Sequence, residues 1–113
     1  MIDEYEFGRI KIGGKGYAKD VIIIEGEVFP NWRREEGHFL RVSDLGKVWE
    51  RKVKVFVVGT GHSGVMKVGE EVREYCKENG IELIEMTTGN AVKKFNELSG
   101  KKKDVAGAFH LTC

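Results

Sequence analysis

The sequence contains no glutamine, one proline and two cysteines among 113 residues. Cys76 and Cys113 form no C-x-x-C pair, so we predict neither a disulfide framework nor a cysteine-based zinc site. No apolar run approaches the roughly 18 residues that a membrane-spanning helix needs. Three of the first six residues are acidic and none is basic, which does not fit a secretory or mitochondrial leader. We therefore expect a cytoplasmic protein with reduced thiols and no membrane partner.

Neither positive nor negative charge is in large excess, because 19 basic residues are balanced by 18 acidic ones. Nucleic-acid-binding proteins usually carry a basic surplus. The only basic run here, Lys101–Lys103, is followed directly by Asp104 and is interpreted as a solvated turn. We expect no nucleic-acid partner. The lack of glutamine, together with many lysines and glutamates, is typical of proteins from hot environments.

The first half of the chain has the pattern of β-strands. Residues 7–12 alternate apolar and polar side chains, and the glycine-rich residues 13–16 predict a turn. The apolar run 21–24 predicts a strand that reverses through residues 25–27 into residues 28–29, where Pro30 ends it. Ser43 or Asp44 is expected to cap a short helix that continues to about residue 51.

The second half alternates strand and helix patterns. Strands are predicted at 53–58, 81–86 and 105–111. A helix with an apolar face from Val65 to Cys76 is expected to end at Gly80, and a second helix is expected from Thr88 to Gly100. Strand–helix–strand units of this length predict adjacent parallel strands. The sequence thus indicates one α/β domain over residues 1–113, with a β-rich N-terminal portion.

The turn from Gly59 to Gly64 matches the G-x-G-x-x-G pattern of dinucleotide-binding proteins. Such a fold needs a longer series of strands and helices than the roughly 50 residues after Gly64 can supply. We therefore expect no dinucleotide and no other cofactor.

A smaller site is compatible with the same turn. Glycines before a helix leave N–H groups free, and Thr87-Thr88-Gly89-Asn90 ends the neighbouring strand at the same edge. The two loops predict a crevice for a small anion such as phosphate or a carboxylate. Its candidate ligand-binding residues are Gly59, Thr60, Gly61, His62, Ser63, Thr87, Thr88 and Asn90. The alternative is that these residues only form turns and cap the helix.

No catalytic constellation is evident. His62 and Ser63 are neighbours in sequence and do not face each other as a base and its nucleophile. The three histidines lack H-x-H or H-x-x-H spacing, so we predict no metal site. Trp32 is unusual in a polar loop, and it either covers the edge of the core or forms a contact surface. No enzymatic activity is assigned.

Several short pieces, taken in order, resemble the adipogenesis-associated small α/β domain family. Its archaeal prototype comes from a methanogen, and a mitochondrial complex I assembly factor is distantly related to it. The resemblance covers nearly the whole chain and depends on order and spacing. The pieces are Gly14, Tyr17, Asp20-Val21, Trp32-Arg33-Arg34, Gly37-His38, residues 57–61, Lys67-Val68, Gly80-Ile81, Thr87, residues 91–98 and residues 109–113.

This resemblance implies a compact layered α/β domain with a mixed central sheet and an N-terminal β-portion beside it. It also implies a binding or assembly-type role without catalysis. Recognition of a small anion at the crevice is the alternative function. A protein partner is unidentified, and self-association is left open. The interaction residues taken from the matching pieces are Trp32, Arg33, His38, Asn96 and His110.

Overall fold

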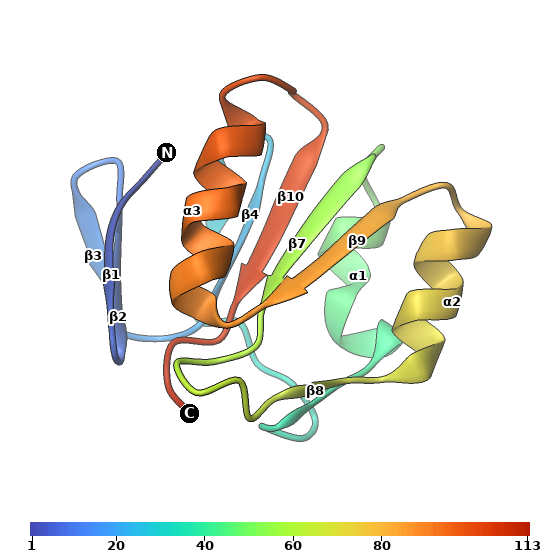
Figure 1. Cartoon of the computed structure of the whole chain (residues 1–113), viewed down its shortest axis with the longest axis horizontal. Helices are drawn as coiled ribbons and strands as arrows, with labels where there is room; N and C mark the ends of the chain where they lie inside the picture. Colours follow the sequence, from blue (N-terminus) through green and yellow to red (C-terminus); the bar gives the residue numbers. More distant parts are fainter.

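A five-stranded mixed sheet forms the centre of the computed structural model, which describes all residues from 1 to 113 (Figure 1). The strand order is β5-β4-β10-β7-β9, and β10 is parallel to β7, which is parallel to β9. On the other side of β10, β4 is antiparallel to β10 and β5 is antiparallel to β4. The predicted α/β class and mixed central sheet are confirmed. The bounds are β4 Val21–Ile24, β5 Glu27–Phe29, β7 Val55–Gly59, β9 Glu82–Met86 and β10 Val105–Phe109.

Alternation along the three inner strands produces two hydrophobic cores, one on each face of this sheet. Successive side chains of a strand point to opposite faces, and all residues of β4, β7 and β10 are buried. Val21, Val57 and Phe109 belong to one core, whereas Ile22 and Val58 belong to the other. The uninterrupted apolar runs in the sequence therefore mark strands covered on both faces.

The two faces have different coverings (Figure 1). α3 (Thr88–Ser99) and a three-stranded sheet cover one face, with Ile10 of that sheet completely buried in the shared core. α2 (Glu70–Glu78), the short helix α1 (Gly46–Trp49) and the 3-10 turn η1 (Val42–Leu45) cover the other. The three-stranded sheet consists of β1 Ile2–Glu6, β2 Arg9–Ile12 and β3 Lys15–Tyr17 in antiparallel order.

The predicted start of the helix after the glycine turn is wrong, because α2 begins later in the sequence. Residues 60–66 form a loop, and β8 (Lys67–Val68) pairs in parallel with β6 (Phe39–Leu40) before α2 begins at Glu70. Val65 and Val68 thus precede the helix. Val65, Val68 and Val72 have the i, i+3, i+7 spacing of a helix face, although only Val72 lies in the helix.

Two further expectations need correction. β10 is not adjacent to β9, because the connection through α3 passes β7 and inserts β10 between β7 and β4. Asp44 is the third residue of η1 and not an N-cap, and it accepts hydrogen bonds from the Arg41 and Glu35 N–H groups at 2.8 and 3.1 Å. No helix in the fold is long and apolar enough to cross a membrane.

Candidate functional site

The two loops predicted to share an edge do meet there. The Gly61 N–H donates to the Thr88 hydroxyl at 2.9 Å, and the Thr88 N–H donates to the Gly61 carbonyl at 3.0 Å. The buried Thr88 hydroxyl in turn donates to the His110 carbonyl at 2.6 Å. The Thr60 N–H also reaches the Met86 carbonyl, at 2.8 Å. The carboxyl ends of β7, β9 and β10 are thereby joined.

The N–H groups of the glycine turn are engaged by the residues after β10. The His62 N–H donates to the Thr112 carbonyl at 3.1 Å. The Ser63 and Val65 N–H groups donate to the Cys113 carbonyl at 3.3 and 3.0 Å. A Cβ added to Gly61 would lie 2.5 Å from the Cys113 carbonyl carbon, so glycine is needed for this close approach. Residues 112–113 therefore occupy the crevice that the sequence predicted for an anion.

The remaining predicted residues of the crevice lie at its rim. Thr87 and Asn90 are joined by a hydrogen bond of 3.2 Å from the Asn90 amide to the Thr87 hydroxyl. They line an open hollow of about 430 Å³ beside Lys93 and Lys94. Thr87 is half-buried and Asn90 is exposed, so this hollow is a surface feature.

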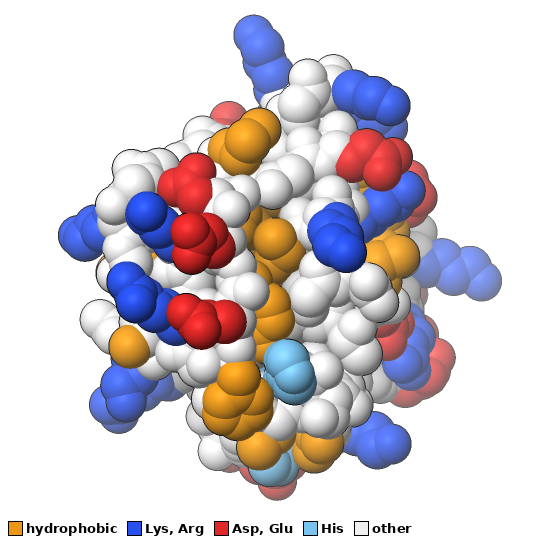
Figure 2. Space-filling view, turned by 60° about the vertical axis from the view of Figure 1, so that its left-hand side comes forward, with side chains coloured by type: hydrophobic (Ala, Val, Ile, Leu, Met, Phe, Trp, Pro, Cys, Tyr) orange, Lys and Arg blue, Asp and Glu red, His pale blue; other side chains and the backbone are white.

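His62 points to the opposite side of the turn, toward the three-stranded sheet. Its Nδ1 lies 3.2 Å from the Tyr5 hydroxyl, and the Phe7 ring packs edge-on against its ring at 5.5 Å. Phe7 is 58% exposed. On the face shown in Figure 2, hydrophobic side chains form a line beside alternating acidic and basic ones, with a histidine at its lower part. His62 itself is exposed.

A separate cavity at the same edge of the sheet brings together three residues predicted for interaction. It has a volume of about 310 Å³ and is lined by Trp32, Arg33 and His110, with Lys19 and Asp20 on the facing segment. The Trp32 N–H donates to the Asp20 carbonyl at 2.8 Å, which holds the two segments side by side. Its remaining lining residues are Ala18, Asn31, Leu111 and Thr112.

Strand register explains why Asp20 and His110 face each other. β4 and β10 are antiparallel with Val21 opposite Phe109, so the residue before β4 lies beside the residue after β10. The Asp20 Oδ2 atom lies 2.7 Å from the His110 Nδ1 atom, and its Oδ1 accepts the Leu111 N–H at 2.8 Å. Two segments 90 residues apart in sequence thus form one buried polar pair.

Arg34 completes the network from below the cavity. Its Nη1 donates to Asp20 Oδ2 at 2.8 Å, and its Nε and Nη2 donate to the Gly37 carbonyl at 3.1 and 2.8 Å. Its guanidinium carbon lies 4.6 Å from the centre of the Trp32 ring. Only 5% of the Arg34 side chain is exposed. Each of the three guanidinium nitrogens of Arg34 has an acceptor, so the side chain is held in place. Its charge neutralises Asp20, and its plane supports the Trp32 ring that lines the cavity.

Asp20 is ionised in this environment. Burial opposes its charge, but hydrogen bonds from His110, the Leu111 N–H and Arg34 together outweigh burial and hold the pKa of Asp20 below its ordinary value. A carboxylate only accepts hydrogen bonds. The His110 Nδ1 atom must therefore carry a proton and donate a hydrogen bond to the Asp20 carboxylate. The hydrogen bond to Asp20 fixes the orientation of the imidazole, as carboxylates do for histidines that ligate metals.

The other predicted interaction residues have structural partners. The His38 ring, which is exposed, packs edge-on against the His110 ring with 5.9 Å between centres. The Trp32 Nε1 donates to the Asp44 carbonyl at 2.9 Å. The Asn96 side chain lies away from the cavity and bonds the backbone of Ile2 at 2.9 and 2.8 Å. Of the predicted set, His38 alone adjoins the Trp32, Arg33 and His110 cavity without lining it.

Sequence reasoning missed Asp20, Lys19 and Arg34 as site residues. Asp20 directly precedes a completely buried strand and His110 directly follows another, which is a signal for a polar pair at a sheet edge. The pairing itself depends on β10 lying next to β4, and no local pattern predicts it.

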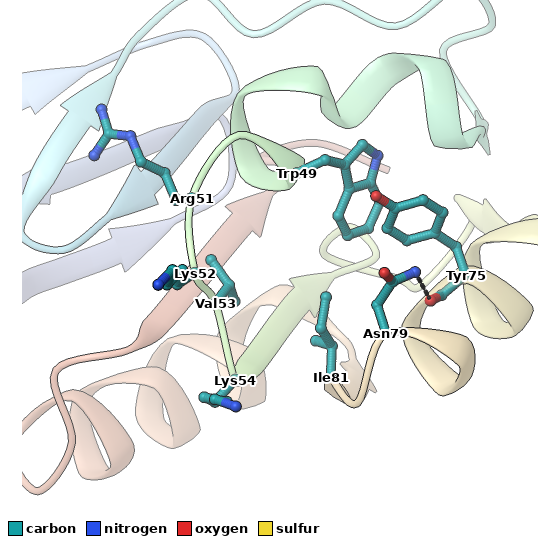
Figure 3. A pocket seen from close by; sticks show the side chains of 8 residues that line it. All are labelled: Trp49, Arg51, Lys52, Val53, Lys54, Tyr75, Asn79 and Ile81. Carbon is teal, nitrogen blue, oxygen red and sulfur yellow. Dashed lines mark hydrogen bonds between the residues drawn. The ribbon is translucent and has the colours of Figure 1, made fainter.

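A second cavity lies at the opposite, amino-terminal edge of β7 (Figure 3). It measures about 220 Å³, and the Trp49 and Tyr75 rings pack at 4.3 Å along one wall. The Arg51 side chain extends away from these rings, and it pairs with Glu25 and Glu27 at 3.4 and 3.5 Å. This cavity lacks a buried charged group, so it is a weaker candidate.

Comparison with known proteins agrees with the fold. Residues 2–110 match the model of a family described as a protein of unknown function, DUF498/DUF598. The chain belongs to this family. Its structure is similar to that of a conserved hypothetical protein from Pyrococcus horikoshii OT3, with 30% identity, a TM-score of 0.84, and coverage of 100% of this chain and 99% of that chain.

Two bacterial proteins of known structure are also similar. One is described as an outer membrane protein from Bartonella henselae, with 25% identity, a TM-score of 0.83, and coverage of 99% of this chain and 94% of that one. The other, from Bordetella pertussis, is described as a Mth938-like domain, with 19% identity, a TM-score of 0.76, and coverage of 98% and 85%. The latter similarity shows the shared fold.

Proposed function

We propose that this protein is a non-catalytic binding module that recognises a small anionic group in the cavity between the ends of β4 and β10. The observation that carries the proposal is the charge of the cavity lining. Lys19 and Arg33 line it and make no ion pair, whereas its one acid, Asp20, is neutralised by Arg34. Two unpaired cations therefore attract a carboxylate or a phosphate.

This cavity is preferred over the glycine turn as the anion site. The turn's N–H groups at residues 62, 63 and 65 already donate to residues 112–113, so an anion there would have to displace backbone hydrogen bonds. The cavity has open volume and free cationic side chains instead. It also lies at the carboxyl edge of the parallel strands, where ligands usually bind in α/β folds.

An assembly-type role, as the sequence resemblance implies, is compatible with such a module. A protein partner can present the anionic group as a side chain or a chain terminus. The cytoplasmic location and the hot habitat are expectations of the sequence alone.

The proposal is tested by calorimetric titration of the whole chain with inorganic phosphate and with acetate at low ionic strength. Charge-assisted hydrogen bonds contribute about 1.5–3 kcal/mol each, so Arg33→Ala and Lys19→Ala should each weaken binding about tenfold. Lys77→Ala is the matched control, because Lys77 is exposed on α2 without an ion pair. Absence of binding at millimolar anion, or equal weakening by Lys77→Ala, would contradict the proposal.

A further inference from the structure

Two buried side-chain nitrogens have no hydrogen-bond partner, Arg41 Nε and His110 Nε2. The rest of the Arg41 guanidinium lies over the Phe39 ring and reaches Glu36 at 3.4 Å, and Arg41 does not line the cavity described above. His110 does line it, with only 7% of its side chain exposed. Buried polar atoms are nearly always paired. The unpaired nitrogen of His110 therefore requires an explanation.

The protonation of His110 defines what its Nε2 can do. Nδ1 carries the proton that it donates to Asp20 at 2.7 Å. The Arg34 Nη2 atom lies 3.1 Å from the same Nδ1, so both neighbours of this ring at that end are side chains of the Asp20 network. In the neutral imidazole with its proton on Nδ1, Nε2 holds the lone pair. It is then a hydrogen-bond acceptor in a residue that lines a cavity whose two unpaired charged side chains, Lys19 and Arg33, are cationic.

We propose that the ligand of this cavity is an anion that also carries a hydrogen-bond donor, and that His110 Nε2 accepts from this donor. The inference rests on the proposed function, because Lys19 and Arg33 hold the negative charge. Two kinds of anion meet both demands. Phosphate and phosphate monoesters can carry a P–OH group, and hydroxycarboxylates carry an alcohol beside the carboxylate.

The acceptor makes the cavity selective against anions without a donor. Sulfate resembles phosphate in size and charge but has no proton at neutral pH, and its oxygens would face the Nε2 lone pair. Acetate differs from glycolate in the same way. A site with a buried acceptor rejects a ligand that leaves the acceptor unpaired. Nε2 is shielded from solvent, so a ligand reaches it only when a neighbouring side chain moves. The exposed His38 ring, packed against the His110 ring, is a side chain that can rotate.

The test compares matched anions on the whole chain at pH 7.5 and constant ionic strength. Dissociation constants are measured by calorimetry for phosphate against sulfate and for glycolate against acetate. We expect the member with a donor to bind at least tenfold more tightly in at least one pair. Selectivity confined to the first pair identifies a phosphoryl ligand, and selectivity confined to the second identifies a hydroxycarboxylate.

The role of His110 is tested separately. His110→Phe retains a ring but removes the acceptor, and it should abolish the selectivity while binding through Lys19 and Arg33 persists. Because this variant leaves Asp20 without one partner and can fail to fold, ring-nitrogen NMR of the unaltered protein is the second measurement. The His110 Nε2 resonance should be that of an unprotonated nitrogen, and it should move on addition of phosphate or glycolate but not of sulfate.

The outcomes separate this inference from the proposed function. Equal binding of all four anions with the Arg33 and Lys19 dependence intact retains the anion cavity and overturns the donor requirement. Selectivity that persists in a folded His110→Phe protein, or a protonated Nε2 in the free protein, also overturns the role of His110. Absence of binding by any anion overturns both.

Discussion

The side-chain amide of Asn96 pairs with the backbone of Ile2 in both directions. Its Oδ1 accepts the Ile2 N–H at 2.9 Å, and its Nδ2 donates to the Ile2 carbonyl at 2.8 Å. Asn96 of α3 thus satisfies the Ile2 N–H and carbonyl at the edge of β1, as a neighbouring strand would. This pair attaches the three-stranded sheet to the helix that covers the central sheet.

Asn96→Ala should therefore destabilise the protein and loosen β1. Two partly buried backbone groups lose their partners, and each such loss costs about 1–3 kcal/mol. Urea denaturation should show the loss of stability, and hydrogen exchange should be faster at the Ile2 amide. Asn90→Ala on the same helix is the control, because the Asn90 side chain is exposed and makes one hydrogen bond of 3.2 Å. An equal effect of both substitutions would count against the attachment.

Asp20→Asn should change how stability depends on pH. The pKa of Asp20 is lowered in the folded state, so the folded state binds fewer protons than the unfolded state at acidic pH. The stabilisation from Asp20 is complete above its unfolded pKa of about 3.9 and is lost as the pH falls through the folded pKa. At neutral pH the substitution should cost about 3–5 kcal/mol, because Arg34 is left buried without its partner.

The measurement for Asp20 is urea denaturation at a series of pH values. The difference in stability between the unaltered protein and Asp20→Asn should shrink as the pH falls below about 4. Glu74→Gln is the control, because Glu74 is exposed and makes no ion pair. A difference that is constant from pH 7 to pH 3 would show that ionised Asp20 is not responsible.

Gly107→Ala should disrupt the middle of β10. A Cβ at residue 107 would lie 2.6 Å from Phe109 Cε2 and 2.8 Å from Phe95 Cδ1. These two rings are in perpendicular contact at 5.5 Å inside the core. Overpacking of this kind costs about 1–3 kcal/mol. The thermal unfolding midpoint should fall.

The matched control for this substitution is Gly46→Ala. Gly46 begins α1 with a φ of −51°, and a Cβ there meets no atom within 4 Å. Alanine in a helix is favoured over glycine by about 0.5–1 kcal/mol, so this variant should be unchanged or more stable. A midpoint for Gly107→Ala as high as that of Gly46→Ala would refute the packing argument.

The two thiols should differ sharply in reactivity. Burial, and to a lesser degree the negative charge of Glu85, raises the pKa of the Cys76 thiol to about 11. Cys113 is exposed. At pH 8 a disulfide reagent should modify one thiol rapidly, and the second only in denaturant, since the thiolate is the reactive species. In Cys113→Ser no rapid phase should be left, and a rapid phase there would place Cys76 at the surface.

Much of the fold could be predicted because the apolar runs are long and the turns contain glycine or proline. β4, β7, β9 and α3 lie within a few residues of the predicted ranges. β1 was not predicted, since Glu4 and Glu6 give it an acidic composition and its stability depends on Asn96 and β2. The predicted start of α2 is too early because Val65 lies in a loop and Val68 lies in β8.

The candidate site was predicted in its residue types and only partly in its position. Trp32, Arg33 and His110 do line one cavity, but the anion crevice at the glycine turn contains residues 112–113. Both the cavity and the filling of the crevice depend on which strands β10 pairs with. Its position between β4 and β7 results from contacts of high sequence separation, and these cannot be read from local periodicity.

The central place of β10 has a consequence for biosynthesis. This strand is translated last among the ten, yet both of its edges are paired, with β4 on one side and β7 on the other. While the ribosome still holds residues 105–109, the nascent chain exposes unpaired edges on β4 and β7, the kind of edge that promotes aggregation. The central sheet can therefore close only after residues 105–109 have left the ribosome.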